Sequence, residues 1–499
     1  MQSCLLFTLI SLLVGARSPP GIVIDGRFDD WGLVERILID PVDALGETLE
    51  LREVRLTSDG RFVHLLVDFG HTVNIQKLDA AIHIVLDVDG DRSTGQLTFG
   101  LSGADLEIIL SPTTLLDRAE RPSGVQLVST DTNAPTLNPY DIGFTFGPTY
   151  ASRRFEFRIE RGAKLAGIPT VLAGGRMQGK IVCTDPEGSI IDQTGVFSSD
   201  LAPLRIAEQT ATAQLPSKIP GAGALRLMSW NAANGSLFDQ PEPFVRVLAA
   251  IDPDVIFLQE LTDRSSAAQL QSFLNRRLLP DESNQWHVVF GAGGGNLRCA
   301  VASKLPLESA EPFELLPYPD WPQRSLRVAG AFVQFANKRL LCISVHLRCC
   351  GGIGSQQDFI RILEVETIRE ELRKLAESGT FDGVIVAGDF NLVGSRRPLN
   401  LLTTRLDIAG LSLIEAEPYQ LDGLSNATWS DRKQSFVPGR LDYLLFSSST
   451  MALRNTFVLD ARDLNPDALH RLRLRSDDTA SASDHFPVVA DVQWAVPGP

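Results

Sequence analysis

Two polar side chains stand directly after an apolar run in the second half of the chain. Residues 384–387 read Val-Ile-Val-Ala, and Gly388 separates them from Asp389 and Asn391. The β-branched run predicts a buried strand, and alternation along extended backbone places both polar groups on one side. A carboxylate and an amide at such a strand end suit a cation and a phosphate, because hard cations prefer oxygen ligands. An Asx turn that simply ends a strand would give the same pattern.

The same arrangement recurs at other predicted strands. Apolar segments deliver Asn231, Glu260 and His346 at their ends, and the last such segment carries Asp484 and His485. A buried carboxylate without a partner is costly, so each one needs a cation or a histidine beside it. The recurrence predicts that the strand ends converge on one pocket.

Strands and helices must position these side chains. Short apolar segments predict strands over residues 225–230, 254–260, 287–290, 299–303, 339–345, 384–391, 439–446 and 483–489. Apolar residues at helical spacing predict helices over residues 241–251, 265–279 and 358–378. This mixture of elements predicts a layered α/β sandwich over residues 224–495.

The first part of the chain has a different pattern. Short alternating segments separated by turns lie at residues 51–56, 62–69, 81–86, 105–110, 154–159 and 179–184. No long stretch there has the 3.6-residue period of a helix. The pattern predicts an N-terminal antiparallel β-sandwich over residues 20–207. Residues 208–223 are rich in small residues, Pro and Gly, and are predicted to be a linker.

Several motifs of the second domain resemble those of the endonuclease/exonuclease/phosphatase superfamily. They follow the order of that family and cover nearly the whole domain: Ser-Trp-Asn231, Leu-Gln-Glu260, Ser-Val-His346, Gly-Asp389-Phe-Asn391, Arg440-Leu-Asp442-Tyr and Ser-Asp484-His485. The resemblance implies a four-layered α/β sandwich of the deoxyribonuclease I type. It also implies that the domain hydrolyses phosphoesters with the help of a divalent cation.

The resemblance implies a small set of metal ligands. Glu260 is the implied main ligand of Mg²⁺, with Mn²⁺ as the alternative ion, while Asn231 lies near the metal and Asp484 completes its shell. Mg²⁺ binds few protein carboxylates and keeps several waters, which fits so small a set. The AP endonuclease branch of the family carries an acidic residue at the position of Ala233. The chain therefore departs from that branch, and the departure favours a single metal ion.

The remaining matched residues are implied to act on phosphorus and on water. Asp389 and Asn391 position the attacking water and a phosphate oxygen, and His346 neutralises developing charge or protonates the leaving oxygen. His485, oriented by Asp442, is the implied general base, and Asp389 is its rival for that role. The metal and preorganised donors would supply most of the barrier reduction.

Other interpretations stay open at some of these positions. His346 could be a buried histidine bonded to backbone, and Asp442 could merely bridge to Arg440. Arg324, Arg348 and Arg440 are candidate phosphate contacts, because a guanidinium group binds phosphate through two parallel hydrogen bonds.

The first domain resembles the family-nine type of carbohydrate-binding module. Residues 24–31, 86–95 and 103–107 carry this resemblance, which implies that an acidic loop holds a structural calcium ion. Sugar-binding members stack their ligand on exposed tryptophans. Trp31 is the only tryptophan of this domain and its position suits core packing. We therefore expect a structural or surface-adhering module in preference to a carbohydrate-binding one.

The acidic loop of this domain has its own pattern. Asp87, Asp89 and Asp91 alternate around Gly90. They offer Ca²⁺ oxygen ligands in the manner of part of an EF-hand loop. A solvated acidic turn is the alternative interpretation.

The start of the chain resembles an export signal. Residues 5–14 form an apolar core, followed by the small residues of Val14-Gly15-Ala16. This predicts a signal peptide over residues 1–18 and a secreted or periplasmic protein, with an uncleaved anchor as the alternative. No other stretch of the sequence has the roughly eighteen apolar residues of a membrane span.

The formal net charge of −15 lacks the basic surplus of a tight nucleic-acid binder. A bound cation reverses the local field, so an acidic metalloenzyme can still act on phosphodiesters. We expect a Mg²⁺-dependent phosphodiesterase, most simply a nuclease, because no long apolar insertion marks a membrane-binding hairpin. The alternatives are a sphingomyelinase-like or inositol-phosphate phosphatase-like enzyme, acting on a phospholipid head group or a soluble phosphoester, or a catalytically inactive binding protein.

Overall fold

The computed structural model describes residues 21–44, 49–117, 122–131, 135–205, 211–219, 223–279 and 285–495. The predicted signal peptide, residues 1–18, lies outside these ranges, as do residues 20, 45–48, 118–121, 132–134, 206–210 and 220–222 of the predicted sandwich and linker. None of the helices in the described ranges is long and apolar enough to cross a membrane.

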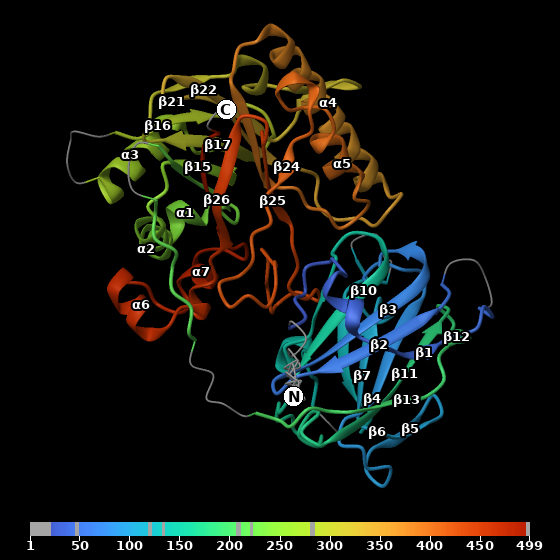
Figure 1. The fold of residues 1–499 in the computed structure, drawn as a ribbon. Helices are drawn as coiled ribbons and strands as arrows, with labels where there is room; N and C mark the ends of the chain where they lie inside the picture. The colour runs from blue at the N-terminus through green and yellow to red at the C-terminus, as the bar shows by residue number, and fades with distance from the viewer. Residues whose placement is uncertain are drawn as a thin grey trace, which may run out of the picture.

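Two larger antiparallel sheets form the first part of the chain (Figure 1). One has the order β1-β2-β3-β10-β9, with β1 (Arg36–Ile39), β2 (Glu53–Ser58), β3 (Phe62–Val73), β9 (Thr145–Gly147) and β10 (Ser152–Glu160). The other has the order β12-β11-β4-β7-β8 with β13 also on β11: β4 (Ala81–Asp87), β7 (Leu106–Leu110), β8 (Val125–Ser129), β11 (Arg176–Thr184), β12 (Ile190–Gln193) and β13 (Phe197–Asp200). Smaller elements are the hairpin β5 (Gln96–Thr98) and β6 (Leu101–Ala104), η1 (Asp30–Leu33) and η2 (Pro139–Ile142).

Alternating apolar residues hold these two sheets together. Val63, Leu65 and Val67 of β3 and Ile82 and Ile84 of β4 are buried in one shared core. Successive side chains of a strand point to opposite faces, so every second residue can face the other sheet. This is the sandwich packing that the alternating segments predict.

The second part of the chain contains two six-stranded sheets. One has the order β16-β17-β15-β14-β27-β26: β14 (Leu225–Asn231), β15 (Val255–Thr262), β16 (His287–Phe290), β17 (Leu297–Ser303), β26 (Met451–Val458) and β27 (Val488–Trp494). The other has the order β18-β21-β22-β23-β25-β24: β18 (Leu307–Ser309), β21 (Val328–Phe335), β22 (Lys338–His346), β23 (Gly383–Asp389), β24 (Ile414–Glu415) and β25 (Asp442–Phe446). A separate hairpin joins β19 (Pro317–Tyr318) and β20 (Trp321–Ser325).

Helices cover the outer faces of these sheets and give four layers. Phe244 of α2 (Pro241–Ile251) packs on Trp230 of β14, with ring centroids 4.6 Å apart. Val365 and Ile368 of α4 (Gln356–Ser378) pack on the second sheet. The helical elements are α1 (Ser236–Asp239), α2 (Pro241–Ile251), α3 (Ala267–Leu278), α4 (Gln356–Ser378), α5 (Arg397–Thr403), α6 (Pro466–Leu472), α7 (Asp478–Ala482), η3 (Glu311–Phe313), η4 (Ile408–Gly410) and η5 (Ala461–Asp463). Another apolar core lies between the two sheets and fixes their separation.

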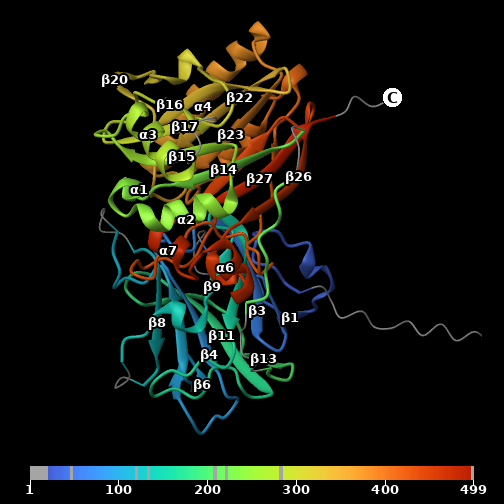
Figure 2. The same cartoon turned by 90° about the vertical axis from the view of Figure 1, so that its left-hand side faces the viewer.

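We call the second part of the chain, with its two six-stranded sheets and covering helices, the layered part. The sandwich packs directly against one end of it (Figure 2). Val437 of the layered part is 3% exposed and belongs to the buried core of the sandwich. Tyr150 of the sandwich packs in return against the core beneath the second sheet of the layered part. The two parts therefore exchange apolar side chains across their contact.

The described part of the predicted linker is also anchored. The backbone N–H of Ala213 donates to Asp463 O at 3.2 Å, and the N–H of Asn465 donates to Ala213 O at 2.9 Å. Residues 211–219 thus follow the surface of the layered part.

Candidate functional site

The register of the second sheet brings three polar side chains together. His346 at the end of β22 lies opposite Asp389 at the end of β23, and Asp389 lies opposite Asp442 at the start of β25. Gly388 precedes Asp389 with φ of 149°, and a Cβ at this position would lie 1.9 Å from Val345 O. Only glycine fits so close a backbone approach, which explains the Gly-Asp pair of the motif.

Glu260 extends toward this group from the first sheet. The register of β15 with β17 shifts between Leu258 and Leu261, and Glu260 has a φ of 55°. Such bulges commonly re-aim a side chain next to a functional site. The Glu260 carboxylate accepts a hydrogen bond of 2.8 Å from the N–H of Asn234. The bulge and this hydrogen bond together hold the carboxylate at the edge of the sheet.

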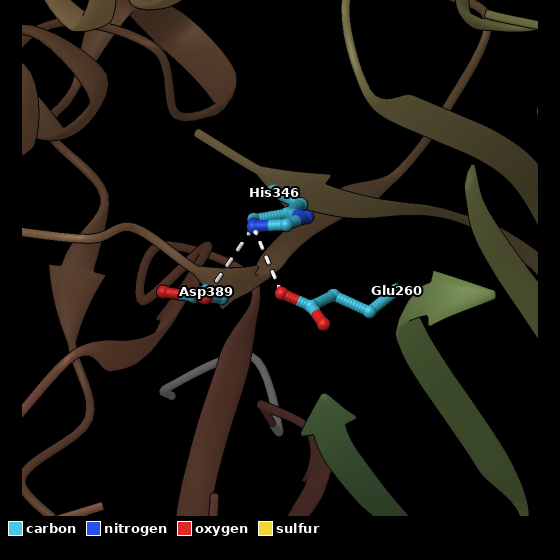
Figure 3. Close-up of side chains that lie close together, drawn as sticks. All are labelled: Glu260, His346 and Asp389. Carbon is cyan, nitrogen blue, oxygen red and sulfur yellow. Dashed lines mark ion pairs between the residues drawn. The ribbon is translucent and has the colours of Figure 1, made fainter. Parts of the chain in front are cut away.

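Glu260, His346 and Asp389 form one cluster (Figure 3). His346 Nε2 lies 3.6 Å from Glu260 Oε1 and 3.6 Å from Asp389 Oδ2. One potential ligand atom from each residue lies within 4.8 Å of the others, so the three could share one metal ion. The Asn231 amide donates to Asp389 Oδ2 at 3.1 Å and thereby orients that carboxylate.

A second cluster adjoins the first through Asp389. His485 Nδ1 lies 2.8 Å from Asp442 Oδ2, and His485 Nε2 lies 3.8 Å from Asp389 Oδ2. The Thr428 hydroxyl also donates to Asp442 Oδ2, at 2.7 Å. The indole of Trp230 donates to the backbone carbonyl of His485 at 2.9 Å. The imidazole is thus held with its Nε2 facing the metal-competent cluster.

Burial and charge shift the pKa values of these groups in different directions. Burial raises the pKa of Asp389; His485 opposes this shift, and the Asp442 and Glu260 carboxylates add to it. Burial lowers the pKa of His485, but the carboxylates of Asp442 and Asp389 outweigh that effect and raise the pKa to about 10. Burial lowers the pKa of His346 well below its usual value. The cluster therefore carries closely spaced carboxylates in a buried setting, which a divalent cation would stabilise.

The other matched residues lie in the same cavity of about 360 Å³. Asn391 has a φ of 49°, its N–H donates to Asp389 Oδ1 at 2.9 Å, and its side chain donates to Leu347 O at 3.1 Å. Asp484 lines the cavity but belongs to neither cluster. Its carboxylate accepts a hydrogen bond of 2.9 Å from the indole of Trp429.

Sequence reasoning missed several residues of this cavity. Gln76, Lys77, Thr149, Arg327 and Trp429 also line it. The first three come from the sandwich, far from every catalytic-type motif in the sequence. Arg327 and Trp429 belong to the layered part but stand in no pattern that marks a site.

The three predicted phosphate-binding arginines lie in different places. Arg324 and Arg348 line an adjoining cavity of about 650 Å³, which meets the first cavity at Arg327. Arg440 lies elsewhere, and its Nη1 pairs with Glu415 Oε1 at 2.7 Å. Arg440 thus lines neither of these two cavities, and its role as a phosphate contact stays a prediction.

The acidic loop of the sandwich also differs from the prediction. Asp87, Asp89 and Asp105 can present oxygen atoms within 4.8 Å of one another. Asp91 stands outside this group, and its carboxylate accepts hydrogen bonds from the N–H and hydroxyl of Ser93 at 2.9 and 2.6 Å. Burial, opposed by a hydrogen bond from Val88 N–H and reinforced by Asp89 and Asp87, raises the pKa of Asp105 to about 6. Asp105 thus stands in the acidic group where Asp91 was expected, and it accepts a hydrogen bond from the N–H of Val88, seventeen residues earlier in the chain.

Comparison with known proteins supports the identity of the layered part. The sequence model of the Endonuclease/Exonuclease/phosphatase family matches residues 228–485. No curated protein matches the chain.

Solved structures resemble about half of the chain. A humanised D. rerio TDP2 is 19% identical, covering 54% of this chain and 99% of its own, with a TM-score of 0.35. The human nocturnin catalytic domain with bound sulfate is 17% identical, covering 55% and 95%, with a TM-score of 0.37. An endonuclease/exonuclease/phosphatase from Bacteroides vulgatus is 16% identical, covering 55% and 99%, with a TM-score of 0.38. Because the family match extends over just more than half of the sequence, from the middle of β14 to His485, the chain belongs to the Endonuclease/Exonuclease/phosphatase family.

Proposed function

We propose that the chain is a divalent-metal-dependent phosphodiesterase and that its substrate is a nucleic acid. The observation that carries this proposal is the pair of linked clusters, Glu260–His346–Asp389 and Asp389–Asp442–His485. All of these residues except the buried Asp442 line one cavity. The family acts on phosphoesters, and this arrangement supplies the proton-transfer and charge-stabilising groups that such a reaction needs.

The chain's own residues divide these tasks. His485 is held by Asp442 at Nδ1, and its Nε2 faces the cavity. A bound cation would offset the carboxylate charge that raises the pKa of this imidazole, and Nε2 could then take a proton from an attacking water. Asp389, 3.8 Å from that Nε2, orients the same water and is the second candidate base. His346 faces the space between Glu260 and Asp389, where its ring nitrogen can donate to a phosphate oxygen.

The donors present fit a hard divalent cation. Glu260 and Asp389 would hold it through carboxylate oxygens, with Mg²⁺ as the expected ion and Mn²⁺ as an alternative. When bound, the cation supplies Lewis-acid stabilisation of the charge that develops on the phosphoryl oxygens.

The neighbouring cavity favours a polyanionic substrate. Arg298, Arg324, Arg327 and Arg348 line it together with the 42% exposed Trp321. The Nε atoms of Arg298 and Arg348 are buried and have no hydrogen-bond partner among the described residues. Guanidinium groups bind successive phosphates, and an exposed indole stacks on bases of a single strand. A nucleic-acid strand would use both features, whereas a single small phosphoester would leave most of this cavity empty.

A substrate panel tests the proposal. The purified full-length chain is incubated with DNA, RNA, sphingomyelin vesicles and inositol phosphates, each with Mg²⁺, Mn²⁺ or Ca²⁺ and with EDTA as the metal-free control. We expect cleavage of nucleic acid that EDTA abolishes and that Asp389→Asn reduces strongly. Asp91→Asn, in the acidic loop of the sandwich, is the charge-matched control. Selective hydrolysis of sphingomyelin or inositol phosphates would overturn the nucleic-acid assignment, and full activity of Asp389→Asn would overturn the catalytic one.

A further inference from the structure

The cavity that holds Glu260, His346 and Asp389 is closed in part by the sandwich. Gln76 and Lys77, from the segment between β3 and β4, line it directly. They precede the family-matched region by about 150 residues. The views of Figures 1 and 2 both show the sandwich against the layered part. The pocket is thus built by both parts of the chain.

Hydrogen bonds fix the segment between β3 and β4 on the layered part. The Asn74 side chain donates to Val393 O at 3.0 Å and accepts from the N–H of Ile353 at 2.5 Å. Val393 stands two residues after Asn391 of the catalytic motif. Because Asn74 is buried and bonded at both ends of its amide, Lys77 three residues later has a defined position relative to the cavity.

The start of β8 also connects the segment between β3 and β4 to the layered part. Gly124 N–H donates to Gln76 O at 2.9 Å, and the next N–H, of Val125, donates to Ser435 O at 2.6 Å. Phe436, the residue after Ser435, also lines the cavity. The segment that carries Lys77 is therefore held between β8 of the sandwich and a loop of the layered part.

Lys77 is a partly buried cation that lies near an aromatic ring. Its Nζ lies 5.5 Å from the ring centroid of Phe436, and it forms no ion pair with any carboxylate in the described part of the chain. Burial lowers the pKa of Lys77, and the nearby Cys350 and the Asp117 carboxylate oppose this shift. The neighbouring Gln76 Oε1 is also buried without a hydrogen-bond partner. Among the described residues, Lys77 therefore has no ion-pair partner and Gln76 Oε1 has no hydrogen-bond donor, and both residues line the cavity.

We propose that the sandwich is part of the substrate site and that Lys77 binds a phosphate group of the substrate that flanks the scissile one. The assignment rests on the proposed function in that the substrate is a phosphoester. A lysine ammonium binds phosphate as a point charge, and a confined, partly dehydrated position strengthens that interaction. The structural alternative is that Lys77 only steadies the loop by its contact with Phe436.

Three full-length variants separate these roles. Lys77→Met removes the charge and keeps the length, Lys77→Arg keeps the charge, and Lys164→Met makes the same charge change at an exposed position of the sandwich. Binding of inorganic phosphate is measured by calorimetry in the presence of Mg²⁺, alongside thermal unfolding and steady-state kinetics on the preferred substrate. For Lys77→Met we expect phosphate affinity about tenfold weaker and KM about tenfold higher, with kcat little changed. Lys77→Arg and Lys164→Met should resemble the parent protein.

The results distinguish the failure of this assignment from that of the proposed function. If no phosphoester is hydrolysed but phosphate binding still requires a cation at residue 77, the hydrolase proposal fails and the Lys77 assignment stands. If the parent protein and Lys77→Met bind phosphate equally, or neither binds it, the assignment is overturned whatever the activity. A lowered melting temperature with unchanged phosphate affinity and KM would show that Lys77 only supports the loop.

Discussion

His485 Nδ1 lies 2.8 Å from Asp442 Oδ2, and the same carboxylate oxygen accepts the Thr428 hydroxyl at 2.7 Å. Asp442 is fully buried at the start of β25, directly opposite Asp389. The carboxylate therefore sets the orientation of the imidazole, and its charge favours the protonated form of the ring.

Asp442→Asn should lower kcat by about 10²–10⁴-fold, because the imidazole loses the charge that orients it and stabilises its protonated form. His485→Ala should cost a similar factor. The double variant should be little worse than His485→Ala, since both act through one imidazole. Single-turnover rates with saturating Mg²⁺ check this expectation. If the fold-losses in kcat of the two single variants multiply in the double variant, Asp442 acts independently of His485.

Glu260→Gln should weaken Mg²⁺ binding at least about tenfold, since it removes a carboxylate charge from the metal-competent cluster. Asp484→Asn should weaken it less, because the Asp484 carboxylate is bonded to Trp429 and stands outside the cluster. Calorimetric titration of both variants with Mg²⁺ measures the difference. A larger loss for Asp484→Asn would place the ion nearer to Asp484 and contradict this ranking.

The convergence of the strand ends could be predicted because it depends on local patterns. Apolar runs ending at His346 and Asp389 are visible in the sequence, and sheet register then places the two side chains opposite each other. The strand Val328–Phe335 was not predicted, since its alanines and glycine lack the β-branched character that marks the neighbouring strands.

Nonlocal contacts explain the positions that the sequence patterns did not predict. Arg440 is part of the family motif Arg440-Leu-Asp442-Tyr. Its ion-pair partner Glu415 lies 25 residues earlier, and no spacing rule connects the two residues. Asp105 replaces Asp91 because β4 and β7 pair, which brings the start of the second strand beside the loop. Lys77 is separated from Asp389 by most of the chain. Such positions follow from how whole sheets pack, which residue periodicity does not encode.

The free energy of unfolding should decrease at acid pH because of His64 in β3. His64 is 2% exposed, and burial, assisted by nearby Arg158 and opposed by Asp59, lowers the pKa of His64 from 6.5 to about 4. Below pH 6.5 the unfolded chain therefore binds a proton that the folded chain does not. This contribution to stability is complete above pH 6.5 and is lost as the pH falls toward 4, by up to about 3 kcal/mol.

His64→Phe should flatten this part of the stability profile, because the replacement cannot gain a proton in the unfolded state. His71→Phe, at an exposed position of the same strand, is the matched control and should leave the profile unchanged. Urea unfolding at pH 5 and pH 7 measures both. Equal pH dependence in the parent protein and His64→Phe would assign the acid sensitivity to other groups.

The exchange of apolar side chains between the two parts predicts that they unfold together. Val437 comes from the layered part but is 3% exposed within the sandwich core. Val437→Ala should lower the free energy of unfolding by about 2 kcal/mol, from lost burial and the cavity left behind. The exposed Val196, at 47%, provides the control Val196→Ala, which should have almost no effect.

Scanning calorimetry should show one transition in the parent protein and in both variants, shifted down only for Val437→Ala. Two separated transitions, with Val437→Ala affecting just one, would mean that the sandwich is an independent module, and its loop could not then hold Lys77 firmly at the catalytic cavity.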